Sequence, residues 1–134
     1  MKIKGVDHIG IAVDNMDECI ETIERLFGLR VSGRETIEAS SVEIAFFPCG
    51  STKIELVTPL TDRSPISGFL RKRGNGIHHI CLEVENIEAW LEALADKGVS
   101  LIDKKPRQGA HGKKVAFIDP RSTCGFLIEL SEED

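Results

Sequence analysis

The chain of 134 residues contains no tyrosine, and its aromatic residues are six phenylalanines and one tryptophan. So few aromatic side chains count against a stacking surface for single-stranded nucleic acid. The absence of tyrosine also removes one common proton donor from any catalytic site. Basic residues are in the minority, with 17 Lys and Arg against 22 Asp and Glu and a net charge of −5. We therefore expect neither nucleic acid nor an anionic membrane as a partner.

Paired cysteines and long apolar runs are also missing. The four cysteines lie far apart in the sequence, at Cys19, Cys49, Cys81 and Cys124. No two of them form a CxxC pair, which counts against a zinc knuckle or a thioredoxin-like motif, and we predict reduced, mostly buried thiols. The apolar stretch 5–13 is interrupted by Asp7 and His8 and is too short to span a bilayer. No signal peptide is visible, so we predict a cytoplasmic protein.

What the sequence does contain is an internal repeat. Residues 6–13 (VDHIGIAV) resemble residues 77–84 (IHHICLEV), at an offset of 71 positions. Each copy is followed by apolar residues spaced as on one face of a helix. The spacing predicts helices within 15–28 and 86–98, each opened by an asparagine cap and ended by a glycine.

Alternating apolar and polar residues after each helix predict strands. In the first half these lie near 29–37, 41–48 and 52–58, and in the second half near 99–102, 113–118 and 124–130. Each half therefore follows the order strand-helix-strand-strand-strand. Ser64 and Pro65 open a short helix between the halves, and Gly74 ends it.

Two matching halves of this kind are typical of modules that pack about a pseudo-twofold axis, because neither half covers its sheet alone. We predict an α+β fold in which two βαβββ modules form an eight-stranded cleft. Module 1 spans about 4–58, the connector 59–76 and module 2 about 77–131 of a single domain. A tandem repeat without a shared cleft is the alternative.

His8 and His79 occupy the same position in the first strand of each half. Alternate residues of a strand share a face, so His8 lies on the face of Val6 and Gly10. A lone histidine in an apolar strand is most often a core residue. A symmetry-related pair is different, because the pseudo-twofold axis can bring both imidazoles to one metal ion.

Two glutamates support the metal hypothesis. Glu55 and Glu129 each lie in the otherwise apolar last strand of a half. A buried carboxylate without a partner would cost several kcal/mol or take up a proton. Two imidazoles and two carboxylates together suit a divalent transition metal, namely Zn²⁺, Mn²⁺, Co²⁺, Ni²⁺ or Fe²⁺. The alternative is that both glutamates point outward into water.

The paired modules, with His-Ile near the start of each, resemble the vicinal oxygen chelate (glyoxalase) superfamily. Several stretches resemble its methylmalonyl-CoA epimerase family in particular, and together they cover nearly the whole chain. These stretches are DHIGIAV (7–13), IELVTPL (54–60), SPI (64–66), GIHHIC (76–81), GAHGK (109–113) and GFLIEL (125–130).

This resemblance implies a metal-dependent isomerase that epimerises methylmalonyl-CoA at C2. It places His8, His79 and Glu129 on the family's metal ligands. Glu55 falls where some members carry glutamine, so it would bind the metal directly or through water. The resemblance favours cobalt, with manganese, zinc or nickel as alternatives.

The family reaction moves a proton on both faces of the carbon between a thioester and a carboxylate. A metal that chelates both groups stabilises the enolate, and two carboxyl groups can carry the protons. The resemblance assigns these carboxyl groups to Glu43 and Glu129. We expect Glu43 to lie in an apolar setting that raises its pKa toward the working range.

The resemblance also implies an acyl-CoA substrate and makes a homodimer plausible. Coenzyme A is anionic, so an acidic protein needs a local basic patch to bind it. The candidates are Arg71-Lys72-Arg73 and the set Lys104, Lys105, Arg107, Lys113 and Lys114. His111, in the Gly-rich loop 108–112, could lie in a segment that closes over the substrate. His78 points away from the face of His79, and we expect it to be structural.

Three other functions fit parts of the same pattern. A glyoxalase I would use similar ligands on a glutathione hemithioacetal. An extradiol dioxygenase would use His8, His79 and Glu129 to hold iron(II). A drug-binding or immunity protein of the same fold would be no enzyme, and it would lack tightly bound metal.

Overall fold

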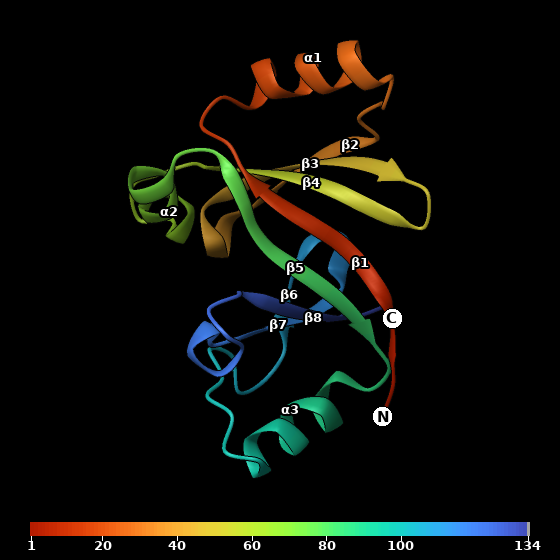
Figure 1. Cartoon of the computed structure of the whole chain (residues 1–134), viewed down its shortest axis with the longest axis vertical. Helices are drawn as coiled ribbons and strands as arrows, with labels where there is room; N and C mark the ends of the chain where they lie inside the picture. The colour runs from red at the N-terminus through yellow and green to blue at the C-terminus, as the bar shows by residue number, and fades with distance from the viewer. Residues whose placement is uncertain (134) are drawn as a thin grey trace. The chain divides into compact units, whose positions relative to one another are not determined.

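The computed structural model of the chain describes residues 1–133 (Figure 1). In chain order the elements are β1 (Ile3–Ala12), α1 (Met16–Phe27), β2 (Gly33–Ile37), β3 (Val42–Cys49), β4 (Thr52–Pro59), α2 (Pro65–Arg73), β5 (Gly76–Val84), α3 (Ile87–Asp96), β6 (Arg107–Gln108), β7 (Lys114–Ile118) and β8 (Ile128–Glu132). The chain consists of two compact units. The first unit is residues 8–78, and the second unit is residues 1–7 together with the chain from His79 onward.

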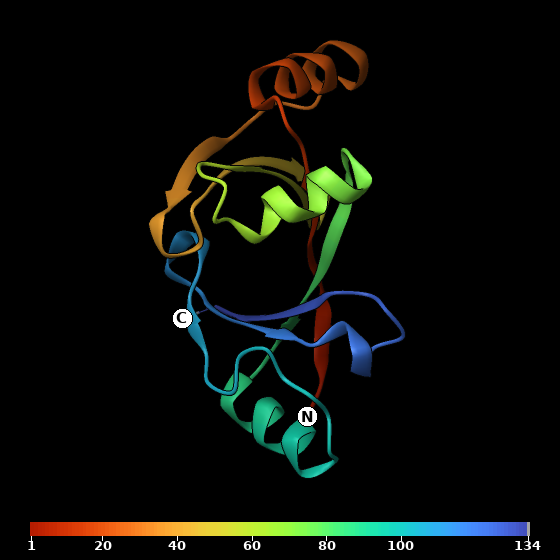
Figure 2. The ribbon, with the colours of Figure 1, turned by 90° about the vertical axis from the view of Figure 1, so that its left-hand side faces the viewer.

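The first unit contains four neighbouring strands in the order β2-β3-β4-β1. β2, β3 and β4 are antiparallel, and β1 pairs with β4 in parallel. Helix α1 covers one face, where Met16 and Ile20 pack against Ala45, Phe47 and Leu56. Helix α2 lies on the other face, where it joins a smaller apolar cluster (Figure 2).

The second unit repeats this plan with four strands in the order β5-β8-β7-β6. β5 pairs with β8 in parallel, and β6, β7 and β8 are antiparallel. Helix α3 covers one face, where Ile87 and Leu91 pack against Ala116, Ile118 and Leu130. Each half of the chain therefore has the order βαβββ, and the predicted α+β fold is confirmed.

The helix ends follow from local sequence. The Asn15 side chain accepts a hydrogen bond from the Glu18 N–H at 3.1 Å. Gly28 ends α1 in the left-handed conformation with φ 69°, which glycine adopts without a Cβ penalty. The Asn86 side chain caps α3 through the Ala89 N–H. Ser64 does the same for α2, so all three predicted helix starts are confirmed.

Three predicted strands differ from the observed ones. The expected strand at 99–102 is wrong, because only Leu101 bridges to Ile118. Beyond it the Asp103 carboxylate accepts the Phe117 N–H and replaces a strand partner. The expected strand at 124–130 begins only at 128, because Cys124 and Gly125 both turn with positive φ.

The expected strand at 29–37 also begins late, at Gly33. The Val31 N–H donates to the Glu24 carboxylate of α1 instead of to a neighbouring strand. The two-residue strand β6 has no counterpart among the predicted strands.

The thiols also differ from expectation. All four cysteines are free, but Cys49 and Cys124 are exposed, Cys19 is half-buried and only Cys81 is buried. The prediction of mostly buried thiols is wrong because Cys49 ends β3 beside a tight turn and Cys124 lies within one. Among residues 1–133, no helix has the length and apolar character needed to cross a membrane.

Candidate functional site

In the first unit, His8 and Glu55 form a buried pair. Their strands β1 and β4 are parallel neighbours, with Gly10 opposite Glu55. His8 therefore shares the face of Glu55, and its Nδ1 lies 3.2 Å from the Glu55 Oε2. His8 is 7% exposed and Glu55 is 4% exposed. The alternative in which Glu55 points outward into water is wrong.

The second unit forms the same kind of pair from His79 and Glu129. β5 and β8 are parallel neighbours, with Cys81 opposite Glu129. The His79 Nε2 lies 3.2 Å from the Glu129 Oε1, and both residues are buried. Phe117, which lies opposite Glu129 on β7, packs its ring nearly perpendicular to the His79 imidazole, with the ring centroids 5.6 Å apart.

Each pair lies on the face of its strands that is turned away from the long helix. The neighbours of Glu55 and Glu129 along their strands, Leu56 and Leu130, belong to the clusters packed against α1 and α3. Because alternate residues of a strand point to opposite faces, the two glutamates lie on the faces that α1 and α3 leave uncovered.

The donor atoms of both pairs suit a first-row transition metal, which binds imidazole nitrogen and carboxylate oxygen. Two such ligands, each about 2.1 Å from one ion and at right angles, lie about 3 Å apart. The observed 3.2 Å in each pair matches this separation. The role of His8, Glu55, His79 and Glu129 as metal ligands stays a prediction, and the geometry within each unit is compatible with it.

Glu43 has different surroundings from those predicted. Its carboxylate accepts two hydrogen bonds from Arg34, from Nη2 at 2.9 Å and from Nε at 3.2 Å. The expectation of an apolar setting is therefore wrong. Phe46 lies opposite Glu55, so Glu43, three residues from Phe46 on the same strand, points to the other face. Glu43 is on the α1 side of the strands, and its role in proton transfer stays a prediction.

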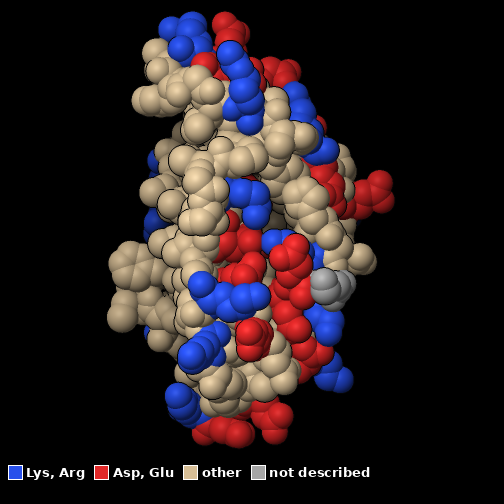
Figure 3. All heavy atoms as spheres, turned by 90° about the vertical axis from the view of Figure 1, so that its right-hand side faces the viewer, with Lys and Arg blue, Asp and Glu red and all other residues tan. Residues whose placement is uncertain are grey.

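Three of the basic residues proposed for coenzyme A form ion pairs within the second unit, namely Arg107, Lys113 and Lys114. Lys114 binds Glu88 at 3.2 Å, and Arg107 lies 3.4 Å from the Asp103 carboxylate. On the face drawn in Figure 3, acidic and basic side chains are interspersed.

Lys113 and Asp7 form a buried ion pair that the sequence did not predict. The Lys113 Nζ donates to the Asp7 Oδ1 at 2.9 Å, with the Asp7 side chain 6% exposed and that of Lys113 15% exposed. Burial alone lowers the pKa of Lys113, but the hydrogen bond and the charge of Asp7 together raise it. Asp7 directly precedes His8, yet nothing in the local sequence links it to a lysine 106 positions away.

The two remaining histidines have separate surroundings. The His78 ring packs edge-on against Phe69 at 5.1 Å, in agreement with a structural role. His111 is in the loop before β7, where it adopts a positive φ of 58°. Gly109 opens that loop in close contact with Val115, and a Cβ on Gly109 would lie 2.9 Å from a Val115 methyl carbon.

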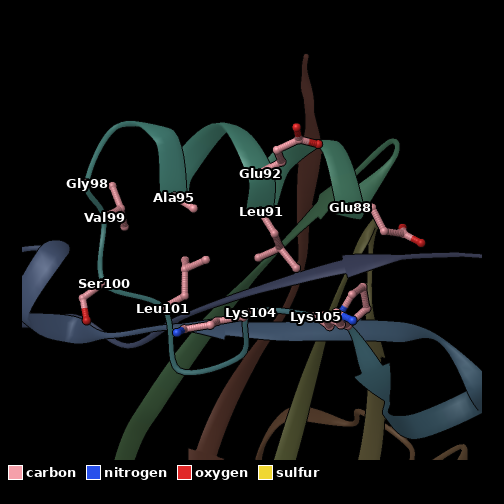
Figure 4. A pocket seen from close by; sticks show the side chains of 11 residues that line it. Glu88, Leu91, Glu92, Ala95, Gly98, Val99, Ser100, Leu101, Lys104 and Lys105 are labelled. Carbon is pink, nitrogen blue, oxygen red and sulfur yellow. The ribbon is translucent and has the colours of Figure 1, made fainter.

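A cavity of about 600 Å³ lies beneath α3 in the second unit (Figure 4). Leu91 of α3 lines it, so the cavity is on the helix side of the strands and not on the side of His79 and Glu129. Lys104 and Lys105 line it, but so do Glu88 and Glu92 of α3. Opposite charges in equal number do not favour an anionic ligand there.

Comparison with known proteins agrees with these features. A family model described as the Glyoxalase/Bleomycin resistance protein/Dioxygenase superfamily matches residues 7–117. The mitochondrial methylmalonyl-CoA epimerase of Dictyostelium discoideum is 41% identical over 129 residues, which is 96% of this chain and 78% of that protein.

Solved structures give the same result. The methylmalonyl-CoA epimerase of Mycobacterium tuberculosis superposes with a TM-score of 0.94 at 33% identity, covering 98% of this chain and 89% of that one. A methylmalonyl-CoA epimerase in complex with methylmalonyl-CoA and NH4+ gives 0.95 at 29% identity, covering 98% and 96%. The chain therefore belongs to the glyoxalase, bleomycin-resistance and dioxygenase superfamily and, within it, to the methylmalonyl-CoA epimerase family.

Proposed function

We propose that this protein is a metal-dependent epimerase that inverts C2 of methylmalonyl-CoA. The observation that carries the proposal is the pair of buried His–Glu contacts at matching positions in the two halves of the chain. Family membership supports it, since the relatives compared above are epimerases by name and one was solved with methylmalonyl-CoA.

His8, Glu55, His79 and Glu129 would hold one divalent transition metal. The donor set fits cobalt, manganese, zinc or nickel, and the family resemblance favours cobalt. When bound, the metal supplies a Lewis acid that stabilises the enolate formed when C2 loses its proton.

Carboxyl groups of the protein would transfer the protons to and from C2. An ionised carboxylate takes the proton from one face of C2, and a protonated carboxyl group on the other face returns one. Glu129 is our candidate for one of these groups, because it is buried beside His79. The family resemblance assigns the other to Glu43, but we do not place Glu43 at C2, because Arg34 binds its carboxylate on the face opposite Glu55.

Exchange of the C2 proton with solvent is the direct test. The purified protein, incubated with methylmalonyl-CoA in D2O, should incorporate deuterium at C2 only when metal is present, as followed by mass spectrometry. Removal of the metal with a chelator should stop the exchange, and added Co²⁺ should restore it. Absence of exchange with metal loaded would contradict the proposal.

Two further assays address the two alternative enzymes. Turnover of the methylglyoxal–glutathione adduct without exchange at C2 would identify a glyoxalase I instead. Oxygen uptake with a catechol would identify a dioxygenase. The predicted homodimer is checked by light scattering, and a mass near 14.8 kDa would contradict it.

A further inference from the structure

Glu43 lies on the α1 side of the strands of the first unit, and the register of β3 against β4 fixes this face. β3 and β4 pair without a bulge from Val42 opposite Pro59 to Cys49 opposite Thr52. Glu43 therefore shares its face with Ala45 and Phe47, which pack against α1. Glu55 lies on the opposite face of the same strands.

Arg34 connects Glu43 to helix α1. Two of its nitrogens bind the Glu43 carboxylate, and its Nη1 binds the Asp17 Oδ1 at 2.7 Å. Asp17 is the second residue of α1. The hydrogen bonds from Arg34, first to Glu43 and then to Asp17, raise the pKa of Arg34 above its ordinary value. Two acids and one arginine thus connect β3, β2 and α1.

The second unit has a counterpart at the repeat-related positions. Asp17 and Glu88 are each the second residue of a long helix, and Glu43 and Lys114 lie on repeat-related strands at the same offset of 71. Lys114 binds Glu88 at 3.2 Å, which connects β7 to α3. Because Lys114 is basic, it reaches the helix acid directly, whereas Glu43 needs Arg34 between two acids.

We infer that Glu43 is a positioning residue that fastens α1 to its strands through Arg34, and that it does not carry a substrate proton. The inference depends on the proposed function only for its activity measurement. A proton carrier would have to share the face of His8 and Glu55, and the Glu43 carboxylate is instead bound by Arg34 on the opposite face.

The decisive variant introduces into the first unit the lysine–acid contact of the second. In Arg34→Ala/Glu43→Lys, a lysine at position 43 can reach Asp17 as Lys114 reaches Glu88. Arg34→Ala alone leaves Glu43 and Asp17 without their shared cation, and we expect its Tm to fall by about 1–4 °C. The double variant should recover most of that loss. Failure to recover would contradict the positioning role.

Activity separates this role from catalysis. Loss of a general base costs about 10²–10⁴-fold, whereas we expect Glu43→Gln and the double variant to keep C2 exchange within about tenfold of wild type. Glu129→Gln is the positive control for loss. A drop of 10²-fold or more in Glu43→Gln at unchanged Tm would overturn the inference. If wild type itself shows no exchange, the proposed function fails, while the Tm comparison still tests the helix connection.

Discussion

The two units are alike where they are buried and differ where they are exposed. Both place a histidine 3.2 Å from a glutamate on the face that the long helix leaves uncovered. Their helices, by contrast, are fastened by an arginine between two acids in one unit and by a lysine–glutamate pair in the other. Desolvation makes buried polar positions intolerant of change, whereas exposed ion pairs contribute little and can exchange their charges.

The comparison of the two units also explains why the sequence suggests a catalytic role for Glu43. It is an acid in an apolar strand, as Glu55 and Glu129 are, and the local sequence pattern does not distinguish the three glutamates. Only the pairing of strands separates them. Repeat symmetry aligns Glu55 with Glu129 opposite equivalent phenylalanines, Phe46 and Phe117, and leaves Glu43 beside the helix.

Glu129→Gln should have the largest effect on activity. It removes a proposed proton carrier and metal ligand, so we expect C2 deuterium exchange to fall by about 10²–10⁴-fold. Mass spectrometry measures the exchange, and elemental analysis measures the bound metal. Glu85→Gln, at an exposed position of the same unit, is the control and should behave as wild type. Exchange within tenfold of wild type would remove Glu129 from the mechanism.

The Lys113–Asp7 pair should have the next largest effect, and it distinguishes the units. The repeat-related position of Lys113 is Val42, which is buried in an apolar cluster. Lys113→Met removes the cation that binds the buried Asp7 carboxylate, which should lower the free energy of unfolding by about 3 kcal/mol. Urea unfolding measures the loss.

The double variant Asp7→Leu/Lys113→Met controls for the cause. It replaces both charges with apolar side chains, as the first unit does at Val42, and should recover much of the stability. If the double variant is less stable than Lys113→Met alone, the loss is due to packing and not to the missing Lys113 cation.

The sequence predicts those features that depend on neighbouring residues. Asn15 and Gly28 bound a helix because a cap and a left-handed turn involve only a few residues. The His and Glu pairs were predictable because equivalent residues occur in both halves of the repeat. The strand expected at 99–102 is reduced to one bridge because the Phe117 N–H donates to the Asp103 carboxylate, in a bond that spans 14 positions.

The face of Glu43 could have been predicted. The two-residue turn at Gly50 and Ser51 sets Cys49 opposite Thr52, so residues that share a face across this hairpin are an odd number of positions apart. Glu43 and Glu55 are 12 positions apart and must lie on opposite faces. The Lys113–Asp7 contact had no such signal, because loop conformation and packing decide it.

Glu55→Gln tests how equivalent the two half-sites are. Some members of the family carry glutamine at this position, and an amide oxygen can still act as a ligand. We expect deuterium exchange to fall less than about tenfold, far less than the loss from a missing acid–base group. Glu55→Leu, which offers no ligand atom, should bind metal more weakly in a chelator competition. Equal losses in Glu55→Gln and Glu129→Gln would make the half-sites equivalent.

Asp119 should have the smallest effect, and only at low pH. It lies between β7 and β8, and the Arg121 side chain is the main cause that lowers its pKa from 3.8 to about 2. Above about pH 5 the carboxylate is ionised in both folded and unfolded chains, so its stabilising contribution is complete. As the pH falls toward 2, the unfolded chain takes up the proton first and the contribution is lost. The difference in Tm between wild type and Asp119→Asn should therefore shrink from pH 5 to pH 2. Ser51→Ala, in the equivalent turn of the first unit, should show a difference that does not change with pH, and a constant difference for Asp119→Asn would contradict the assignment.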